Sequence, residues 1–313
     1  MKAHGLGTLA ASLHPVPPFD FEQSLKFLGD FSPMNGEQRL GVRALTKAVR
    51  FQGQTVGFSL RASAEPLAAE LTCELFADQA LKPGAGEAVR ERARFFLSLD
   101  DDLTPFYALA EHDAPFRKVI QQLYGYHQVK FLTPFENACW AVLTQRTSGI
   151  LARVMKRKLV ETYGGSVHCG SGPLWAFPEP ADLGHVSAEE LGTVVGNSRK
   201  GEYLAAAVQA FGQIKEDWLR QAPHDEVETW LRAIHGIGAW SATFVLLRGL
   251  GRMERASFED PDGRFTEEMM KAAARVYGPL NFEAFRAHAH RYGDWQGYWA
   301  HYLRAAGAGK SAE

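Results

Sequence analysis

Cysteine is scarce in this chain of 313 residues, and its three cysteines lie far apart. Cys73, Cys139 and Cys169 have none of the short spacings that bind zinc or hold an iron–sulfur cluster. Three isolated thiols also cannot build a disulfide framework. The sequence therefore disfavours a structural zinc site, an iron–sulfur enzyme and a disulfide-stapled secreted protein. We expect a reducing cytoplasm.

Long apolar runs and an excess of one charge are also missing. No stretch approaches the roughly 20 apolar residues of a membrane span, and residues 1–12 carry little positive charge, so we expect neither a membrane protein nor a signal peptide. Lys and Arg number 34 against 36 Asp and Glu, a net charge of −2, so nucleic-acid binding would need local basic patches. What is present is 46% apolar residues, enough for two or three packed domains.

The first hundred residues carry a strand pattern. Val56, Phe58 and Leu60 alternate with small residues, and residues 71–75 alternate apolar with polar side chains. A period of two is typical of half-buried strands. One helical face follows Pro83 and Gly84. The pattern predicts a small antiparallel sheet with one or two helices.

Helix signals dominate from residue 100 onward. Thr133, Pro134 and Glu136 combine an N-cap threonine, a first-turn proline and a glutamate three residues after the cap, which predicts a capping box. Residues 151–163 form a helical segment that ends at a Gly-Gly pair. Further helix starts are predicted at Thr104, Asp113, Ser187 and Thr266. The predicted fold class is therefore α+β: a small N-terminal antiparallel β-sheet domain followed by mostly α-helical subdomains.

The segment 231–244 is the most informative for chemistry. An amphipathic helix is predicted to end at His235, and Gly236, Ile237 and Gly238 form a tight hairpin before a second helix that runs to about residue 248. Two glycines let the backbone turn sharply and approach another molecule closely. The start of the second helix offers free N–H groups and a positive dipole end, which suit a phosphate. Alone, this segment is more typical of an ordinary helix–turn–helix corner with a glycine stop.

An acidic loop follows the second helix, with Asp260, Pro261 and Asp262 before Arg264. Hairpin and loop together resemble the helix-hairpin-helix DNA glycosylases, in which an essential aspartate follows the hairpin. Other segments resemble the bacterial 3-methyladenine DNA glycosylase II branch, in the same order along the chain: 17–28, 134–145, 198–204 and 295–298. The resemblance implies a β-rich domain at 1–99 and a helical glycosylase region at 100–313. Within it, 132–250 would form a central subdomain that contains the hairpin, and 100–131 would join 251–313 across a catalytic cleft.

The resemblance assigns the catalytic carboxylate to Asp260, with Asp262 as the nearby competitor. A carboxylate beside C1′ stabilises the oxocarbenium-like sugar that forms as the base leaves, and it can orient the attacking water. Trp240 stands where bifunctional relatives have a lysine nucleophile, which implies a monofunctional enzyme that leaves an abasic site. Trp240 and Phe244 share a helical face and are expected to line the base pocket; Trp140 and Tyr298 are further candidates. Each of these aromatics is also compatible with a place in the core.

The target base is buried in the duplex, so it must be flipped out. The resemblance places Gln145 and the wedge residue Arg146 at this step, and Arg146 replaces the apolar residue of the branch. Phosphate contacts are expected from Gly236, Gly238 and Ser241, with positive charge from Arg199 and Lys200. The resemblance also implies a monovalent cation, Na⁺ or K⁺, on the backbone carbonyls of Arg232, Ile234 and Ile237; no cofactor is required.

The sequence thus predicts a monofunctional DNA glycosylase that excises alkylated bases of the 3-methyladenine and 7-methylguanine type from damaged double-stranded DNA. We expect a monomer with no membrane contact in the bacterial cytoplasm. One alternative is a non-catalytic or weakly active helix-hairpin-helix protein that binds DNA lesions. Another is an 8-oxoguanine glycosylase, which Trp240 disfavours.

Overall fold

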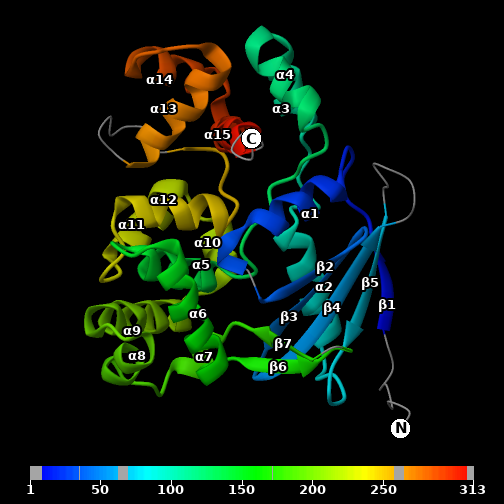
Figure 1. Ribbon diagram of the computed structural model, residues 1–313, viewed down its shortest axis with the longest axis vertical. Coiled ribbons are helices and arrows are strands. Elements are labelled where there is room, and N and C mark those ends of the chain that lie inside the picture. The colour runs from blue at the N-terminus through cyan, green and yellow to red at the C-terminus, as the bar shows by residue number, and fades with distance from the viewer. Residues whose placement is uncertain (1–8, 35, 63–69, 171, 257–263, 309–313) are drawn as a thin grey trace.

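The computed structural model describes residues 9–34, 36–62, 70–170, 172–256 and 264–308. Its N-terminal part is a five-stranded antiparallel sheet with the order β1-β5-β4-β3-β2 (Figure 1). The predicted alternation is confirmed, because Leu71, Cys73 and Leu75 of β5 are buried while Thr72 and Glu74 are exposed. The strands and the helices of this part are β1 (Leu9–Leu13), α1 (Phe21–Asp30), η1 (Ser32–Met34), β2 (Gln38–Gly41), β3 (Ala44–Phe51), β4 (Gln54–Ala62), β5 (Leu71–Phe76) and α2 (Ala85–Phe96).

The rest of the described chain is mostly helical, so the predicted α+β class is confirmed. Its elements are α3 (Thr104–Glu111), α4 (Ala114–Gln122), α5 (Pro134–Thr144), α6 (Gly149–Tyr163), β6 (Gly165–His168), β7 (Pro173–Ala176), α7 (Pro180–Leu183), α8 (Ala188–Val195), α9 (Ser198–Gln213), α10 (Glu216–Gln221), α11 (His224–Ala233), α12 (Ala239–Arg248), α13 (Arg264–Tyr277), α14 (Phe282–Arg291), η2 (Gly293–Trp295) and α15 (Gln296–Ala308). None of the helices within the described ranges is long and apolar enough to cross a bilayer.

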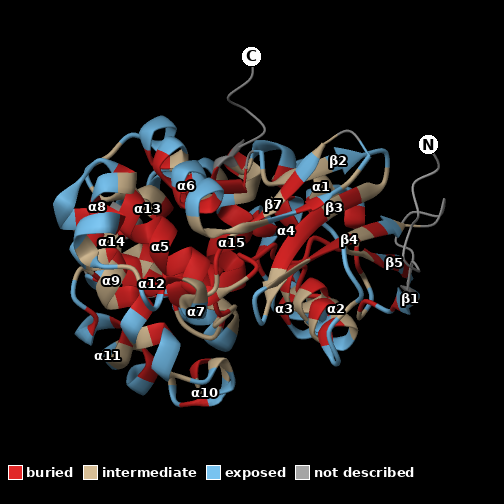
Figure 2. Ribbon diagram, turned by 90° about the horizontal axis from the view of Figure 1, so that it is seen from below, coloured by how far each residue is buried: buried red, intermediate tan, exposed pale blue. Residues whose placement is uncertain are grey.

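Helix α5 is enclosed by its neighbours, and its residues 134–143 are all buried (Figure 2). Thr133 caps it as predicted, with its hydroxyl accepting from the N–H of Glu136 at 3.0 Å. The reciprocal half of the capping box does not form. The Glu136 carboxylate instead lies 2.7 Å from the buried ammonium of Lys156 in α6. The Glu136 carboxylate is therefore used in an ion pair with the next helix and not in the cap of its own helix.

Two hydrophobic cores organise these layers. The sheet shares one continuous core with α2 and with the helices from α5 to α12. A second core joins residues between Leu103 and Tyr126 to residues between Leu247 and Leu303. The chain therefore contributes to the second core before and after the central helices. The boundaries at residues 99, 132 and 250 stay predictions.

Candidate DNA-binding hairpin and base pocket

The hairpin between α11 and α12 occupies residues 234–238. Helix α11 ends at Ala233, two residues before the predicted end at His235. The N–H of Ile237 donates to the carbonyl of Ile234 at 2.9 Å, which closes the turn. Both isoleucines are buried, and Ile237 is only 4% exposed, so they fill the space between the two helices.

The structure requires glycine at one hairpin position, whereas a side chain would fit at the other. Gly236 has φ +90°, and a Cβ there would lie 2.3 Å from Cγ of Tyr203. Gly238 has φ −87°, and an added Cβ would meet no heavy atom within 4 Å. Gly238 also begins α12 without a side-chain cap. The first N–H groups of α12 therefore have no intrahelical partner, and they can bind an anion.

A network of hydrogen bonds holds the hairpin against the end of α5. The Gln145 amide nitrogen Nε2 donates to the Gly236 carbonyl at 2.7 Å. The Ser241 hydroxyl lies 3.5 Å from the same nitrogen, and Ser241 is only 3% exposed. Ser241 also lines the groove along the hairpin, so its predicted phosphate contact stays a prediction.

Lys200 contacts the protein backbone and not the DNA-facing surface that was predicted for it. Its ammonium donates to the carbonyls of Val142, Leu143 and Gln145 at 2.7–2.9 Å. All three donors are used at the C-terminal end of α5, and burial lowers the pKa of the ammonium. The prediction of Lys200 as a DNA-facing cation is thus wrong; it fastens α9 to α5.

Two arginines beside the hairpin remain at the surface. Arg146 is exposed and adopts φ +49°, a left-handed conformation that is uncommon outside glycine. Arg199 is exposed, and its Nε donates to the Tyr203 hydroxyl at 2.7 Å. A groove of about 760 Å³, here called the hairpin groove, runs along this face and is lined by Thr144, Gln145, Arg146, Tyr203, residues 232–238, Trp240 and Ser241.

A second, more apolar cavity lies one helical turn beyond the hairpin. Trp240 stacks on Phe244 with ring centroids 5.2 Å apart and planes 10° apart. Phe244 in turn lines a cavity of about 290 Å³, here called the aromatic pocket. Its other lining residues are Gln23, Lys26, Phe27, Asp30, Phe31, Gln122, Leu123, Tyr126, Arg248, His301, Arg304 and Ala305.

The aromatic pocket holds a buried cation between two rings. The Arg248 guanidinium lies 4.8 Å from the Phe27 ring centroid and 5.0 Å from that of Phe31. Burial lowers the pKa of this guanidinium to about 10. Burial, with Arg248 and Arg304 nearby, also holds the pKa of His301 well below its usual value, so that imidazole is neutral at pH 7. Sequence reasoning missed Phe27, Phe31, Tyr126 and His301 as pocket residues.

Two predicted pocket residues belong to the core. Trp140 is 5% exposed within α5. Tyr298 is 1% exposed in the second core, and its hydroxyl donates to Asp101. Neither lines the aromatic pocket, so these two assignments are wrong. Asp260, together with Pro261 and Asp262, lies outside the described residues.

No family model matches the chain. Among curated proteins it is 31% identical over 157 residues to the DNA-3-methyladenine glycosylase of Bacillus subtilis, which covers 50% of this chain and 52% of that one. It is 27% identical over 218 residues to the probable bifunctional transcriptional activator/DNA repair enzyme AlkA of Mycobacterium tuberculosis, covering 68% and 41%. The chain spans about half the length or less of these curated relatives.

Among solved structures, the 3-methyladenine DNA-glycosylase from Archaeoglobus fulgidus aligns with a TM-score of 0.77 over 97% of this chain and 100% of that one, at 20% identity. A Clostridium acetobutylicum 8-oxoguanine glycosylase/lyase aligns with a TM-score of 0.66 over 96% and 98%, at 12% identity. The chain therefore has the fold of these solved DNA glycosylases, and its sequence is similar to that of the Bacillus subtilis DNA-3-methyladenine glycosylase over half of its length.

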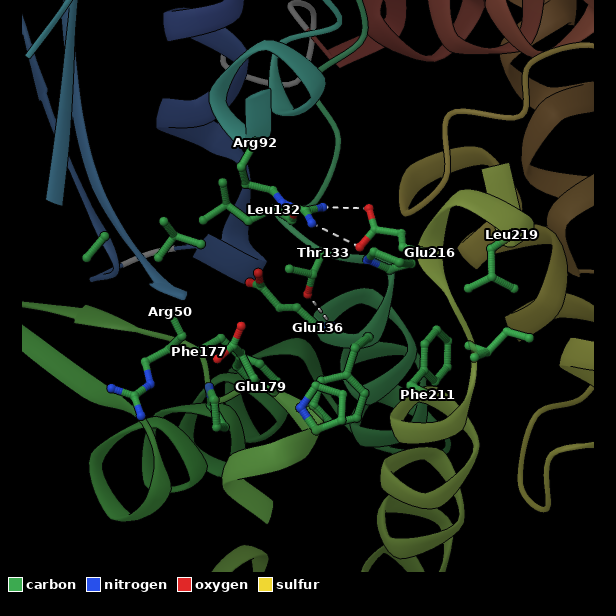
Figure 3. A pocket seen from close by; sticks show the side chains of 17 residues that line it. Arg50, Arg92, Leu132, Thr133, Glu136, Phe177, Glu179, Phe211, Glu216 and Leu219 are labelled. Carbon is green, nitrogen blue, oxygen red and sulfur yellow. Dashed lines mark hydrogen bonds and ion pairs between the residues drawn. The ribbon is translucent and has the colours of Figure 1, made fainter. Parts of the chain in front are cut away.

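A further cavity, of about 180 Å³, lies between the sheet and the helices (Figure 3). Arg92 donates to both carboxylate oxygens of Glu216, at 2.6 and 3.0 Å. Arg50 reaches both oxygens of Asp182, at 2.6 and 3.0 Å. Because these partly buried charges are paired with each other, we interpret the cavity as part of the packing between the sheet and the helices and not as a ligand site.

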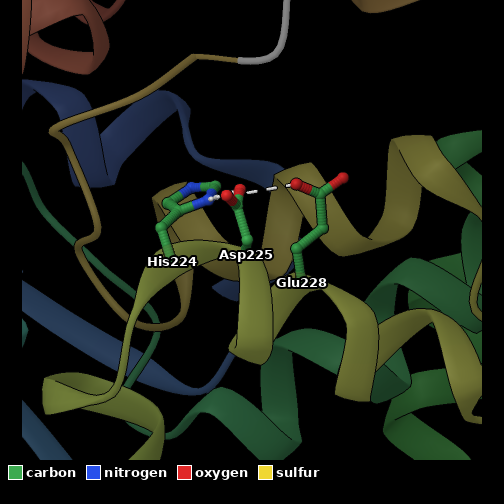
Figure 4. A group of neighbouring side chains, drawn as sticks. All are labelled: His224, Asp225 and Glu228. Carbon is green, nitrogen blue, oxygen red and sulfur yellow. Dashed lines mark ion pairs between the residues drawn. The ribbon is translucent and has the colours of Figure 1, made fainter.

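His224, Asp225 and Glu228 gather at the start of α11 (Figure 4). The His224 Nδ1 lies 3.9 Å from a carboxylate oxygen of each acid. Asp225 is already paired with Arg255 at 2.5 Å. The positive end of the α11 dipole also disfavours a cation here. We therefore interpret the group as a charge-paired helix start, and it carries no metal assignment.

Proposed function

We propose that this protein is a monofunctional DNA glycosylase that removes alkylated bases of the 3-methyladenine and 7-methylguanine type from damaged double-stranded DNA. The observation that carries the proposal is the stacked pair of Trp240 and Phe244, which links the hairpin groove to the aromatic pocket. A strand held along the hairpin would have its extruded base delivered past Trp240 to the pocket. The names of the curated relatives support the same activity.

The chemistry of the proposal needs one carboxylate at the sugar. As the glycosidic bond breaks, positive charge develops on the deoxyribose, and Asp260 would stabilise it and orient the attacking water. An alkylated purine is already cationic, so it leaves as a neutral base without a strong general acid. Trp240 has no amine and forms no Schiff base, so the product is an abasic site in an uncut strand.

The proposed contacts with DNA come from the hairpin backbone and from the exposed arginines. Phosphate oxygens would accept from the first N–H groups of α12, beside Gly238, while Arg146 enters the gap left by the extruded base. Na⁺ or K⁺ would bind the carbonyls of Arg232, Ile234 and Ile237, because the first two lie at the negative end of α11. The Ile234 carbonyl already accepts from the N–H of Ile237, and it would offer its second lone pair to the ion. The protein would act as a monomer in the bacterial cytoplasm and need no other cofactor.

The decisive experiment measures base release from methylated duplex DNA by chromatography. We expect wild type and Asp262→Asn to release methylated bases, and Asp260→Asn to bind the same DNA without release. Binding without release by wild type would favour the non-catalytic lesion-binding protein. Strand cleavage before alkali treatment would indicate lyase chemistry of the 8-oxoguanine glycosylase kind. Circular dichroism of each variant controls for folding.

A further inference from the structure

Three buried polar atoms of the aromatic pocket have no hydrogen-bond partner among the residues that the structure describes. They are Nη2 of Arg248, the hydroxyl of Tyr126 and Nε2 of His301, and their residues are only 6%, 2% and 8% exposed. They come from α12, from the loop after α4 and from α15, yet all three residues line one cavity. Buried polar groups are normally paired, so three unpaired atoms around one apolar cavity call for a ligand that pairs them.

The charge of the pocket restricts the chemical class of ligand that can bind there. The Arg248 guanidinium is desolvated between Phe27 and Phe31. Of the other charged residues that line the cavity, Lys26 and Asp30 are exposed, and Arg304 pairs with Glu268 at 2.7 Å. The buried part of the pocket is therefore positive, and it offers donors where a bound base must present acceptors.

Purines differ in what they present to such donors. A 6-oxopurine carries the acceptor O6, and it also offers N7 where that nitrogen is not alkylated, as in hypoxanthine. These two adjacent acceptors match the fork of a guanidinium. Adenine carries an amino group at position 6, whose hydrogens would face the cation. The Tyr126 hydroxyl and the neutral His301 imidazole can each donate one further hydrogen bond to an acceptor.

We propose that Arg248, assisted by Tyr126 and His301, makes this pocket selective for bases with an exocyclic carbonyl oxygen, such as guanine-type and hypoxanthine-type lesions, over adenine-type lesions. This specificity rests on the proposed function for its biological substrate, a base extruded from DNA. The pocket itself can be tested with free bases, without catalysis.

The test titrates full-length protein with free hypoxanthine and with free adenine, followed by ligand-observed NMR. We expect hypoxanthine to bind at least about tenfold more tightly, the scale of one charge-assisted hydrogen bond. Arg248→Met should abolish the difference, and Arg248→Lys should keep part of it, because the charge remains without the fork. Arg291→Met, which removes an exposed arginine of α14, is the matched control and should behave as wild type.

Tyr126→Phe removes only the unpaired hydroxyl, so it tests the pocket if Arg248→Met does not fold. It should weaken hypoxanthine binding several-fold and leave adenine binding unchanged. Equal binding of the two bases, binding of neither, or an unchanged preference in both Arg248→Met and Tyr126→Phe would overturn the proposal.

A second measurement separates this inference from the proposed function. Duplexes of one sequence carry either hypoxanthine or 1,N6-ethenoadenine, both neutral and only the first with a carbonyl oxygen. We expect kcat/KM to favour hypoxanthine, and Arg248→Met to remove that preference. If free hypoxanthine binds selectively but methylated DNA yields no base, the proposed function fails and the selectivity of the pocket stands. If methylated bases are released without any dependence on Arg248, the proposed function stands and the proposed selectivity of the pocket fails.

Discussion

The side-chain amide of Gln145 donates to the main-chain carbonyl of Gly236 at 2.7 Å, and this hydrogen bond joins the end of α5 to the hairpin. The residue that the family resemblance places in contact with DNA thus also supports the hairpin from behind. We therefore expect Gln145 to affect DNA binding through the position of the hairpin backbone.

Replacing Gln145 with glutamate should weaken DNA binding by about tenfold, because a carboxylate cannot donate to the Gly236 carbonyl and adds negative charge beside the phosphates. Fluorescence anisotropy with a duplex that contains a stable abasic analogue measures the effect. Gln209→Glu makes the same change at an exposed position of α9 and is the matched control. Equal losses in the two variants would show that the effect is general electrostatics.

The two hairpin glycines should respond differently to alanine. Gly236→Ala places a Cβ 2.3 Å from Tyr203 Cγ at a left-handed φ, so we expect a loss of about 2–4 kcal/mol in the free energy of unfolding. Gly238→Ala meets nothing in the free protein and should leave stability within about 1 kcal/mol of wild type. Urea unfolding measures both. Destabilisation by Gly238→Ala equal to that of Gly236→Ala would contradict this account of the turn.

Lys200 and Arg199 are adjacent in sequence and should separate stability from DNA binding. Lys200→Met leaves three carbonyls at the end of α5 without their donor, and should cost about 2–4 kcal/mol of stability. Arg199→Met should change stability little and lower the salt dependence of DNA binding by about one phosphate contact. Thermal unfolding and binding titrations across salt concentrations distinguish the two. A stable Lys200→Met with a reduced salt slope would restore the surface-cation interpretation.

Local sequence signals were sufficient for much of the fold. The alternation at 71–75, the Thr133 cap and the two-glycine hairpin each depend on residues close together in the chain, and all three are observed. The Glu136 half of the capping box was wrong because its partner, Lys156, comes from the next helix. A tertiary ion pair of this kind leaves no spacing signal in the sequence.

The aromatic pocket was only partly predictable for the same reason. Phe244 follows Trp240 by one turn, so helical spacing joins them. Phe27 of α1, Tyr126 and His301 reach the same cavity from distant segments, and each would suit a core position equally well. Trp140 and Tyr298 illustrate the converse, since large aromatics near functional motifs are often core residues. Only the packing of α1 and α15 against α12 decides between the two roles.

The ion pair between Arg92 and Glu216, which joins α2 to α10, predicts how the fold responds to acid. Burial alone would raise the pKa of Glu216, but Arg92 and Arg220 lower it below its ordinary value of 4.5. Near pH 4 the unfolded chain therefore binds a proton that the folded protein does not. The stabilisation is complete above pH 4.5 and is lost as the pH falls through the lowered folded-state pKa.

Glu216→Gln should thus cost about 2 kcal/mol at pH 7 and clearly less at pH 3, which flattens the acid side of the stability profile. Urea unfolding across this pH range measures the profile. Glu91→Gln removes the exposed carboxylate that pairs with Arg220 at 2.8 Å and serves as the control, with a small change at every pH because its charge is screened by water. A loss in Glu216→Gln that stays constant from pH 7 to pH 3 would mean that the variant acts through packing, and not through the charge that Arg92 and Arg220 stabilise.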